Sequence, residues 1–175
     1  MTPAWIGTAT QGRDDNQRPQ DRRAFHMKLR VYLDTSVFSA YFDSRTTDRQ
    51  RETEAFWARR TDFELATSEL AREELRQAPD PTQRRRLLGL LRGFSLLVVT
   101  DEMQALGQRY VHEGVFTSTM LNDAVHVAAA VLSRQDVLLS WNFRHLVNRR
   151  RRARVNEVNV EAGLSTIEIL APPEL

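Results

Sequence analysis

The stretch that decides the fold is Leu121-Asn-Asp-Ala-Val-His-Val-Ala-Ala-Ala-Val-Leu132, which is long enough for a helix and strongly apolar. A helix that is apolar around its whole circumference is buried on nearly every side. Its polar residues, Asn122, Asp123 and His126, then need partners or a cavity, because unpaired polar groups are costly to bury. The sequence therefore predicts a covered helix that brings polar groups into the interior.

Short apolar runs alternate with helical patterns on both sides of this stretch. We expect helices that include Val37 to Tyr41 and Leu70 to Leu75, and others at residues 46–60, 82–92, 101–114 and 119–132. Strands are expected at 29–33, 63–66, 96–99, 137–139 and 166–170. The polar segment 147–163 lacks periodicity and is expected to be a surface loop.

This alternation predicts an α/β fold, a three-layer α/β/α sandwich around a central, mostly parallel sheet. The expected strands are continuous Val and Leu runs, as when helices cover both faces of a sheet. Residues 1–26 are polar and without a period, whereas Met27 begins MKLRVYLDTS, a natural protein start. We expect a domain at 27–175 preceded by a disordered tail or start-site artefact at 1–26.

Composition excludes several classes of protein. The chain has 175 residues, of which 41% are hydrophobic, and no apolar run approaches the roughly 20 residues that span a bilayer. It has no cysteine, so disulfides and thiolate metal sites are excluded. Residues 1–26 lack the apolar core of a secretory signal, so a cytoplasmic location is the default expectation.

Acidic and amide residues lie where parallel strands end, which is where ligands bind in open α/β sheets. Asp34 directly follows the first expected strand, and Asn142 lies just beyond the strand at 137–139. Asp123 lies in the first turn of its helix. Glu74 lies one turn into the expected helix that includes Leu70 to Leu75, and from there it could reach inward. Clustered carboxylates favour Mg²⁺ or Mn²⁺, which can activate water and stabilise charge on a phosphate.

Each of these acids has a simpler interpretation. Asp34 could only cap a helix, and Asp123 could only be a first-turn acid that the helix dipole stabilises. Glu74 could be an ordinary helical glutamate, with Glu69 and Glu73 as competitors for any inward role. Single positions do not separate these interpretations.

Four segments in order resemble the PIN domain family: Val31-Tyr-Leu-Asp-Thr-Ser-Val-Phe-Ser39, Thr67-Ser-Glu-Leu-Ala-Arg-Glu-Glu-Leu75, Asn122-Asp-Ala-Val-His-Val-Ala-Ala-Ala130 and Leu138-Leu-Ser-Trp-Asn-Phe-Arg-His-Leu146. The resemblance implies a metal-dependent ribonuclease that cuts single-stranded RNA with water. Asp34, Glu74 and Asp123 would organise the metal in such an enzyme, with Asp34 and Asp123 as its ligands. Many bacterial relatives are VapC-like toxins that a small antitoxin protein blocks.

One departure from the family pattern is Asn142, where many PIN nucleases carry aspartate. An asparagine offers a carbonyl oxygen but no charge, so a second ion should bind more weakly. An RNA-binding module with weak or no cleavage is therefore the alternative to a toxin nuclease. A protein-interaction domain that keeps the fold without metal is a third possibility.

The net charge is only +2, but every cation except Lys28 is an arginine. Coding bias explains this composition, although arginine also binds two phosphate oxygens at once. We expect RNA phosphates to be guided by Arg144, His145, Arg149, Arg150 and Arg151, unless this run is only a solvated loop.

Several further residues have a structural interpretation. His126 and Trp141 are expected to be core residues rather than a metal ligand and a base platform. Phe56, Trp57 and the leucines after Arg86 could support a homodimer or could be ordinary core.

Overall fold

The computed structural model describes residues 27–175, and the expected tail at 1–26 lies outside the described residues. A five-stranded sheet with strand order β3-β2-β1-β4-β5 forms its centre. Every neighbouring pair is parallel, as predicted. The strands are β1 (Arg30–Leu33), β2 (Glu64–Ser68), β3 (Ser95–Leu97), β4 (Val137–Leu139) and β5 (Glu168–Leu170).

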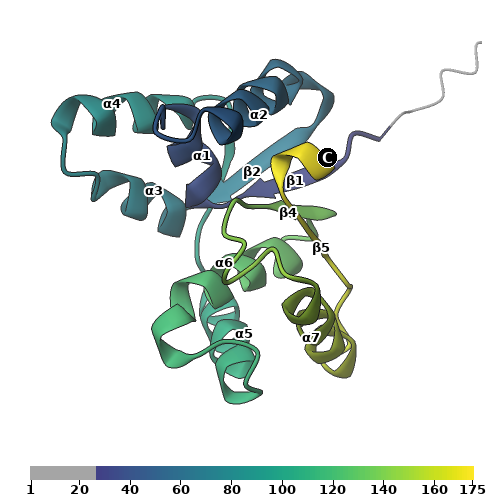
Figure 1. Ribbon diagram of the computed structural model, residues 1–175. Helices are drawn as coiled ribbons and strands as arrows, with labels where there is room; N and C mark the ends of the chain where they lie inside the picture. Colours follow the sequence, from purple (N-terminus) through teal and green to yellow (C-terminus); the bar gives the residue numbers. More distant parts are fainter. Residues whose placement is uncertain (1–26) are drawn as a thin grey trace, which may run out of the picture.

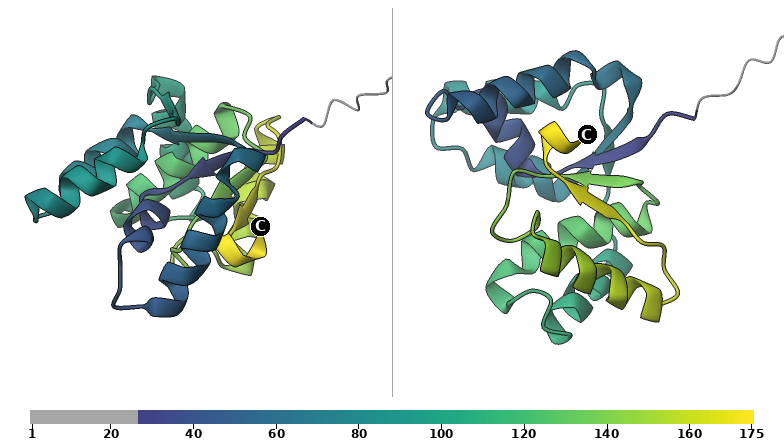
Figure 2. Two further views of the ribbon diagram at one scale, coloured as in Figure 1. Left: turned by 90° about the horizontal axis from the view of Figure 1, so that it is seen from above. Right: turned by 45° about the vertical axis from the view of Figure 1, so that its right-hand side comes forward.

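Helices cover both faces of the sheet, which confirms the three-layer α/β/α prediction (Figures 1 and 2). One layer holds α1 (Thr35–Tyr41), α2 (Thr47–Ala58), α3 (Glu69–Arg76) and α4 (Pro81–Leu90). The other holds α5 (Asp101–His112), α6 (Leu121–Leu132) and α7 (Arg149–Glu161). Short 3-10 turns are η1 (Arg60–Asp62), η2 (Ser118–Met120) and η3 (Pro172–Glu174). No helix within residues 27–175 is long and apolar enough to cross a membrane.

The central strands divide their side chains between two hydrophobic cores, because successive residues of a strand point to opposite faces. Val31 and Leu33 join the core under α1 to α4, whereas Tyr32 joins the core against α5 to α7. Leu139 and Leu138 divide in the same way on β4. Both faces are covered, which explains why these strands read as continuous apolar runs.

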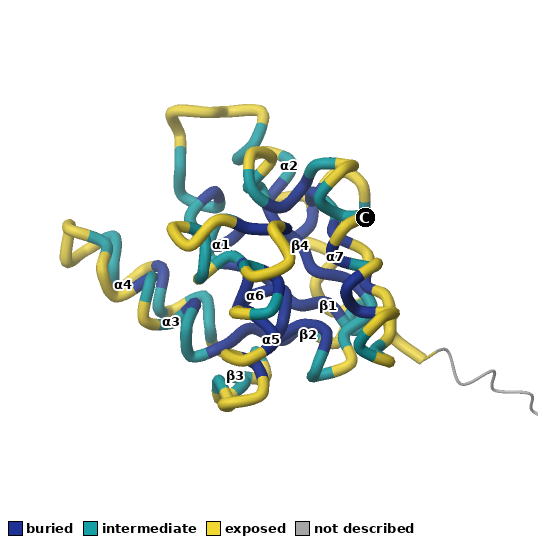
Figure 3. The backbone as a smooth tube through the Cα atoms, turned by 90° about the horizontal axis from the view of Figure 1, so that it is seen from below, coloured by how far each residue is buried: buried dark blue, intermediate teal, exposed yellow. Residues whose placement is uncertain are grey.

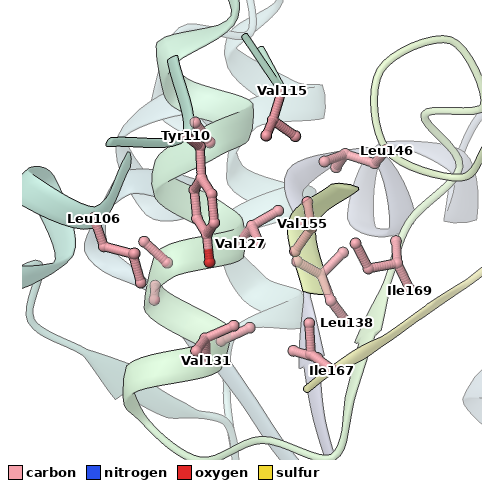
Figure 4. Close-up of a cluster of buried hydrophobic side chains, with 14 of the residues drawn as sticks. Leu106, Tyr110, Val115, Val127, Val131, Leu138, Leu146, Val155, Ile167 and Ile169 are labelled. Carbon is pink, nitrogen blue, oxygen red and sulfur yellow. The ribbon is translucent and has the colours of Figure 1, made fainter. Parts of the chain in front are cut away.

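Helix α6 is buried, as its composition predicts, with every residue from Ala124 to Val131 in the interior. Figure 4 shows Val127 and Val131 of α6 facing side chains from the sheet and from α7. Helix α5 packs closely on α6, because a Cβ built on Gly107 would lie only 2.8 Å from Val125 Cγ2. Only a residue without a side chain fits at that crossing.

Capping residues explain where the helices near the site begin. Ser68 caps α3, with its hydroxyl accepting from the Ala71 N–H at 3.4 Å. Asp80 caps α4, and Pro81 occupies the first helical position, where its missing N–H costs nothing. Pro79 and Pro81 therefore lie where α3 has ended and α4 begins.

The predicted loop at 147–163 is wrong, because residues Arg149–Glu161 form α7. Asn148 caps this helix by accepting from the Arg151 N–H at 2.9 Å. Its inner face uses Val155, Val158 and Asn159, whose amide oxygen accepts a hydrogen bond from the Tyr110 hydroxyl. A helix that buries asparagine beside only two valines has no clear hydrophobic period, so the sequence pattern conceals it.

The aromatic residues of α2 belong to the core of the single chain. Phe56 and Trp57 are buried and pack with Phe38 and Leu75 between α1, α2 and α3. Leu87 is also buried, whereas the other leucines of α4 are only partly covered. Figure 3 shows the same contrast along the backbone, because the centre of the molecule is buried and the outer end of the α3–α4 pair is exposed.

Candidate active site

Asp34 lies at the carboxyl end of β1, where the backbone of β4 also ends. Its backbone N–H donates to the Leu139 carbonyl at 3.1 Å, which ties the two strand ends together. Its carboxylate accepts from the Ser36 N–H at 3.0 Å, the Ser36 hydroxyl at 2.5 Å and the Ser140 hydroxyl at 2.7 Å. Asp34 therefore caps α1 and also lies in a polar cluster between two strands.

This Asp34 carboxylate is buried, with only 4% of the residue exposed. Burial raises its pKa, although the charge of His126 and the bonds from Ser36 and Ser140 act in the opposite direction. All of its hydrogen-bond donors are uncharged serine and backbone groups. A bound cation would therefore compensate a buried charge at this position.

Glu74 reaches inward from α3 and contacts both α1 and α6. Its carboxylate accepts from the Thr35 hydroxyl, from Asn122 Nδ2 at 2.9 Å and from His126 Nε2 at 3.1 Å. Glu73, one position earlier, is turned outward and pairs with Arg76 at 3.1 Å. The geometry thus places Glu74, rather than Glu73, beside the other candidate acids.

The Glu74 carboxylate is a fixed anion. Burial raises its pKa, but the hydrogen bond and charge of His126, with bonds from Thr35 and Asn122, lower the pKa to about 2. Burial lowers the pKa of His126, but Glu74, Asp34 and Asp123 outweigh it and leave the pKa raised. The pair is therefore strongly coupled, and these charges all lie near the same imidazole.

A hydrogen-bonded chain continues from His126 into the sheet. His126 Nδ1 and the Ser68 hydroxyl each lie 2.7 Å from the Tyr32 hydroxyl. Burial raises the pKa of Tyr32, so its hydroxyl keeps its proton. A protonated His126 can donate from one nitrogen to Glu74 and from the other to Tyr32, which then donates to Ser68.

Asp123 lies at the start of α6 and contacts the loop that follows β4. Asn142 Nδ2 donates to one carboxylate oxygen at 3.0 Å, and His145 Nδ1 lies 2.9 Å from the other. The side-chain oxygen of Asn142 accepts from the His145 N–H at 3.0 Å. Asn142 therefore presents its amide nitrogen, not its carbonyl oxygen, to the acid.

The four predicted site residues come together through shared partners. The Ser140 hydroxyl donates to Asp34 and accepts from the Asn142 N–H at 2.9 Å, and Asn142 in turn binds Asp123. Glu74 joins the same helix end through Asn122 and His126. The acids that follow β1 and β2 or begin α6, and the amide of Asn142 that follows β4, thus converge at one edge of the sheet, as parallel topology requires.

The donor chemistry fits a hard cation, since carboxylate and hydroxyl oxygens are the ligands that Mg²⁺ prefers. Asp34 and Asp123 are the acids that would hold it. Within residues 27–175, no three acidic or histidine side chains are arranged as a metal-binding group. An ion held by these two acids would therefore take the rest of its ligands from water, as Mg²⁺ usually does.

The expected phosphate-binding run divides into two kinds of arginine. Arg144, Arg149 and Arg150 are exposed. Arg151 is half-buried, donates to the His145 carbonyl at 2.7 Å and lies over the Phe116 ring at 5.0 Å from its centroid. Arg151 therefore supports the loop that carries His145, whereas the exposed three can meet a polyanion.

Several residues of the cluster were not among the predicted site residues: Tyr32, Thr35, Ser36, Ser68, His126 and Ser140. His126 is buried as predicted, but it also contacts Glu74 and Tyr32. Its spacing from Asn122, one helical turn, is the signal that places both side chains on one face of α6. The alternation along β1 is the only sequence signal for Tyr32, and it does not distinguish this tyrosine from a core residue.

Comparison with known proteins adds a family and a fold. The sequence model of the PIN domain matches residues 31–147. DNA-bound VapBC from Salmonella typhimurium is similar in structure, with a TM-score of 0.55 at 13% identity over 82% of this chain and 98% of that chain. VapC20 from Mycobacterium tuberculosis, a sarcin-ricin loop cleaving toxin, gives 0.53 at 13% identity over 78% and 98%. A toxin-antitoxin complex from Klebsiella pneumoniae gives 0.52 at 20% identity over 69% and 93%. No curated protein sequence matches the chain significantly.

Proposed function

Because the chain belongs to the PIN domain family, we propose that it is a divalent-metal-dependent endoribonuclease that cleaves single-stranded RNA. The observation that carries the proposal is the convergence of Asp34, Glu74 and Asp123 at the carboxyl edge of the sheet, with Ser140 and Asn142 linking two of them. Acids gathered at this edge suit metal-assisted phosphodiester hydrolysis better than they suit packing.

The residues have different roles in this proposal. When bound, Mg²⁺ or Mn²⁺ would supply an activated water and neutralise charge on the phosphate. Asp34 and Asp123 would hold the ion. Glu74 has a pKa of about 2 and three donors on its carboxylate, so it is a poor proton acceptor. Its role is to hold α3 against α6 and so to position Asp123.

The loop after β4 adjusts Asp123. Asn142 and His145 both contact its carboxylate, and both come from this one loop. An ion at Asp123 must share or replace these contacts. Asn142 and His145 are therefore proposed as positioning residues, and the exposed Arg144, Arg149 and Arg150 as phosphate contacts.

The structural neighbours support a further step, that the protein is the toxin of a toxin–antitoxin pair. Two of them are described as VapBC or toxin-antitoxin complexes, and the third as a toxin. We propose a small antitoxin as the partner. A neighbouring reading frame whose product copurifies with this chain and suppresses RNA cleavage would support this assignment, and a product that does neither would contradict it.

The direct test is cleavage of a mixed panel of single-stranded RNAs with Mg²⁺ or Mn²⁺, comparing the wild type with Asp123→Asn. We expect a loss of at least about 100-fold, because loss of even an outer-shell metal partner costs 10–100-fold. Asp62→Asn is the matched control, since Asp62 is exposed in η1. EDTA should stop cleavage by the wild type.

Three outcomes would change the assignment. Equal cleavage by wild type and Asp123→Asn would place catalysis elsewhere. No cleavage with retained RNA binding would favour the RNA-binding module, for which the amide of Asn142 in place of an acid is the supporting observation. No binding and no cleavage would leave a protein-interaction domain.

A further inference from the structure

The loop after β4 exposes an aromatic side chain directly beside the candidate site. Phe143 is 55% exposed although it is a large apolar residue. It immediately follows Asn142, whose side chain contacts Asp123. The next residue, Arg144, is exposed as well. An exposed aromatic residue and an exposed arginine are therefore consecutive in this loop.

Phe143 forms one wall of a hollow of about 490 Å³ between this loop, α2 and the C-terminal turn. Trp141 and Pro173 are the other apolar walls. Trp141 and Phe143 lie 5.9 Å apart between ring centroids, tilted by 60°. The hollow is large enough for one planar nucleobase, and it is open on the side where Phe143 is exposed.

The hollow is rigidly connected to the candidate site. Trp141 is held on both sides, because its indole N–H donates to Thr53 of α2 at 2.8 Å and its backbone N–H donates to the Ser36 hydroxyl at 2.8 Å. That hydroxyl in turn donates to Asp34. The position of the aromatic wall is therefore fixed relative to the acids.

We propose that this hollow takes one unstacked base of the single-stranded RNA substrate, which stacks on Phe143, while Arg144 binds a phosphate of the same strand. The inference rests on the proposed function and identifies a substrate contact for it. Base–aromatic stacking is tolerant of sequence, because every base has a π-face. The site would therefore position the strand without selecting one base.

The charges around the hollow favour a base over a phosphate inside it. Its polar rim consists of Thr46, Asp48, Arg49 and Glu52. Arg49 is paired with Asp43 at 2.7 Å, and Arg51 lies 3.3 Å from Asp48 and 3.6 Å from Glu52, so each charge of the rim has an opposite charge beside it. The rim therefore offers a phosphate only a cation that is already paired, whereas the N–H groups on a base edge can donate to a carboxylate. The cations assigned to phosphate, Arg144, Arg149 and Arg150, are not part of the lining of the hollow.

The test measures binding of a short, labelled, mixed-sequence single-stranded RNA to the full chain carrying Asp123→Asn, across a salt series with Mg²⁺. Phe143→Leu keeps apolar bulk and removes the π-face, so we expect roughly tenfold weaker binding with an unchanged salt dependence. Phe143→Trp should bind as tightly as the parent. Arg144→Gln should reduce the slope of log K against log salt by about 0.7, the value for one phosphate contact on a single strand.

Val160→Ala serves as the matched control, because Val160 is 63% exposed on α7, away from the hollow. Equal RNA binding by Phe143→Leu and its parent would overturn the inference while leaving the nuclease proposal intact. A Phe143→Leu variant that binds RNA normally but loses a copurifying protein would show a protein pocket instead, and would also overturn it. Failure of the wild type to bind or cleave RNA would remove both proposals together.

Discussion

Helix α6 carries contacts to two carboxylate–histidine pairs that differ in their surroundings. Glu74 and His126 meet at 3.1 Å, and only 3% of the histidine side chain is exposed. Asp123 and His145 meet at 2.9 Å, with 27% of that histidine side chain exposed. The first pair connects three helices and a strand, whereas the second connects α6 to a single loop. The two pairs therefore have similar contact distances, but we expect them to contribute differently to the free energy of unfolding.

The buried pair is a structural anchor, and the open pair is an adjustable contact. Removing Glu74 would leave Nε2 of His126 without water or a replacement bond, because only 3% of that side chain is exposed. In the open pair, water replaces a lost partner at little cost. Under the proposed function, an ion at Asp123 would require that acid to be free to change partners and Glu74 to keep its position.

The largest expected effect comes from breaking the buried pair. His126→Ala should destabilise the fold by about 3 kcal/mol, because it removes buried volume and leaves Glu74 and Tyr32 each without one partner. Urea unfolding measures the change. His112→Ala, at the exposed last residue of α5, is the control. A loss below about 1 kcal/mol would mean that the buried pair is no anchor.

A smaller effect is expected from the next link of the same chain. Tyr32→Phe keeps the ring in the core and removes only the hydroxyl that contacts Ser68 and His126. The fold should lose about 1–2 kcal/mol, the usual cost of leaving buried partners unpaired. If the melting temperature does not change, water or a new rotamer replaces the hydrogen bond to His126. The stabilising hydrogen-bonded series would then end at the histidine.

The pH dependence of stability should reveal the buried pair in metal-free protein. The folded pKa of Glu74, about 2, lies below its ordinary 4.5, so its contribution is complete above 4.5 and disappears as the pH falls through 2. The folded pKa of His126 is raised above 6.5, so its contribution is complete below 6.5 and disappears as the pH rises through the folded pKa. Both contributions are complete between 4.5 and 6.5.

Urea unfolding of the wild type and Glu74→Gln in EDTA measures this window. The difference in stability should be largest between pH 4.5 and 6.5, at about 1–2 kcal/mol after screening of a partly exposed carboxylate. Glu73→Gln is the matched control, because Glu73 is the residue next to Glu74 and its carboxylate pairs with Arg76 on the surface. A pH-independent difference would show that the two groups are not coupled.

The smallest effect on stability is expected at the open pair. His145→Ala should change the unfolding free energy by less than about 0.5 kcal/mol, since its side chain is partly exposed and water can replace it beside Asp123. Thermal unfolding measures it alongside His126→Ala. A loss as large as that of His126→Ala would make the two pairs equivalent and end the comparison.

The sequence determines more of the scaffold than of the polar contacts. The parallel sheet could be predicted because its strands are continuous apolar runs, and α6 because it is apolar around its whole circumference. Helix α7 could not, because Asn159 takes a buried position that a hydrophobic residue usually fills. Asp34 could be predicted as a site residue because it directly follows an expected strand. Nothing local distinguishes Glu74 from Glu73, since the choice depends on where Thr35 and Asn122 lie in space.

Serine contacts between distant strand ends are the least predictable part of the site. Ser140 and Asp34 are separated by 106 positions and meet only because β1 and β4 are neighbours in the sheet. Tyr32 reads as a core residue, which it is, and its hydroxyl acquires a role only through the position of His126. Such partners depend on tertiary packing rather than on any sequence period.

The close crossing of α5 and α6 at Gly107 has a consequence for mutational screens. A single added methyl group there would press on Val125, and Val125 lies between Asp123 and His126 on the helix that carries both pairs. In a selection for loss of function, Gly107→Ala should therefore be recovered together with substitutions of Glu74 and Asp123, although Gly107 packs against Val125 and not against those acids. A map of inactivating alleles would therefore extend the boundary of the site to the buried face of α5 that packs on α6.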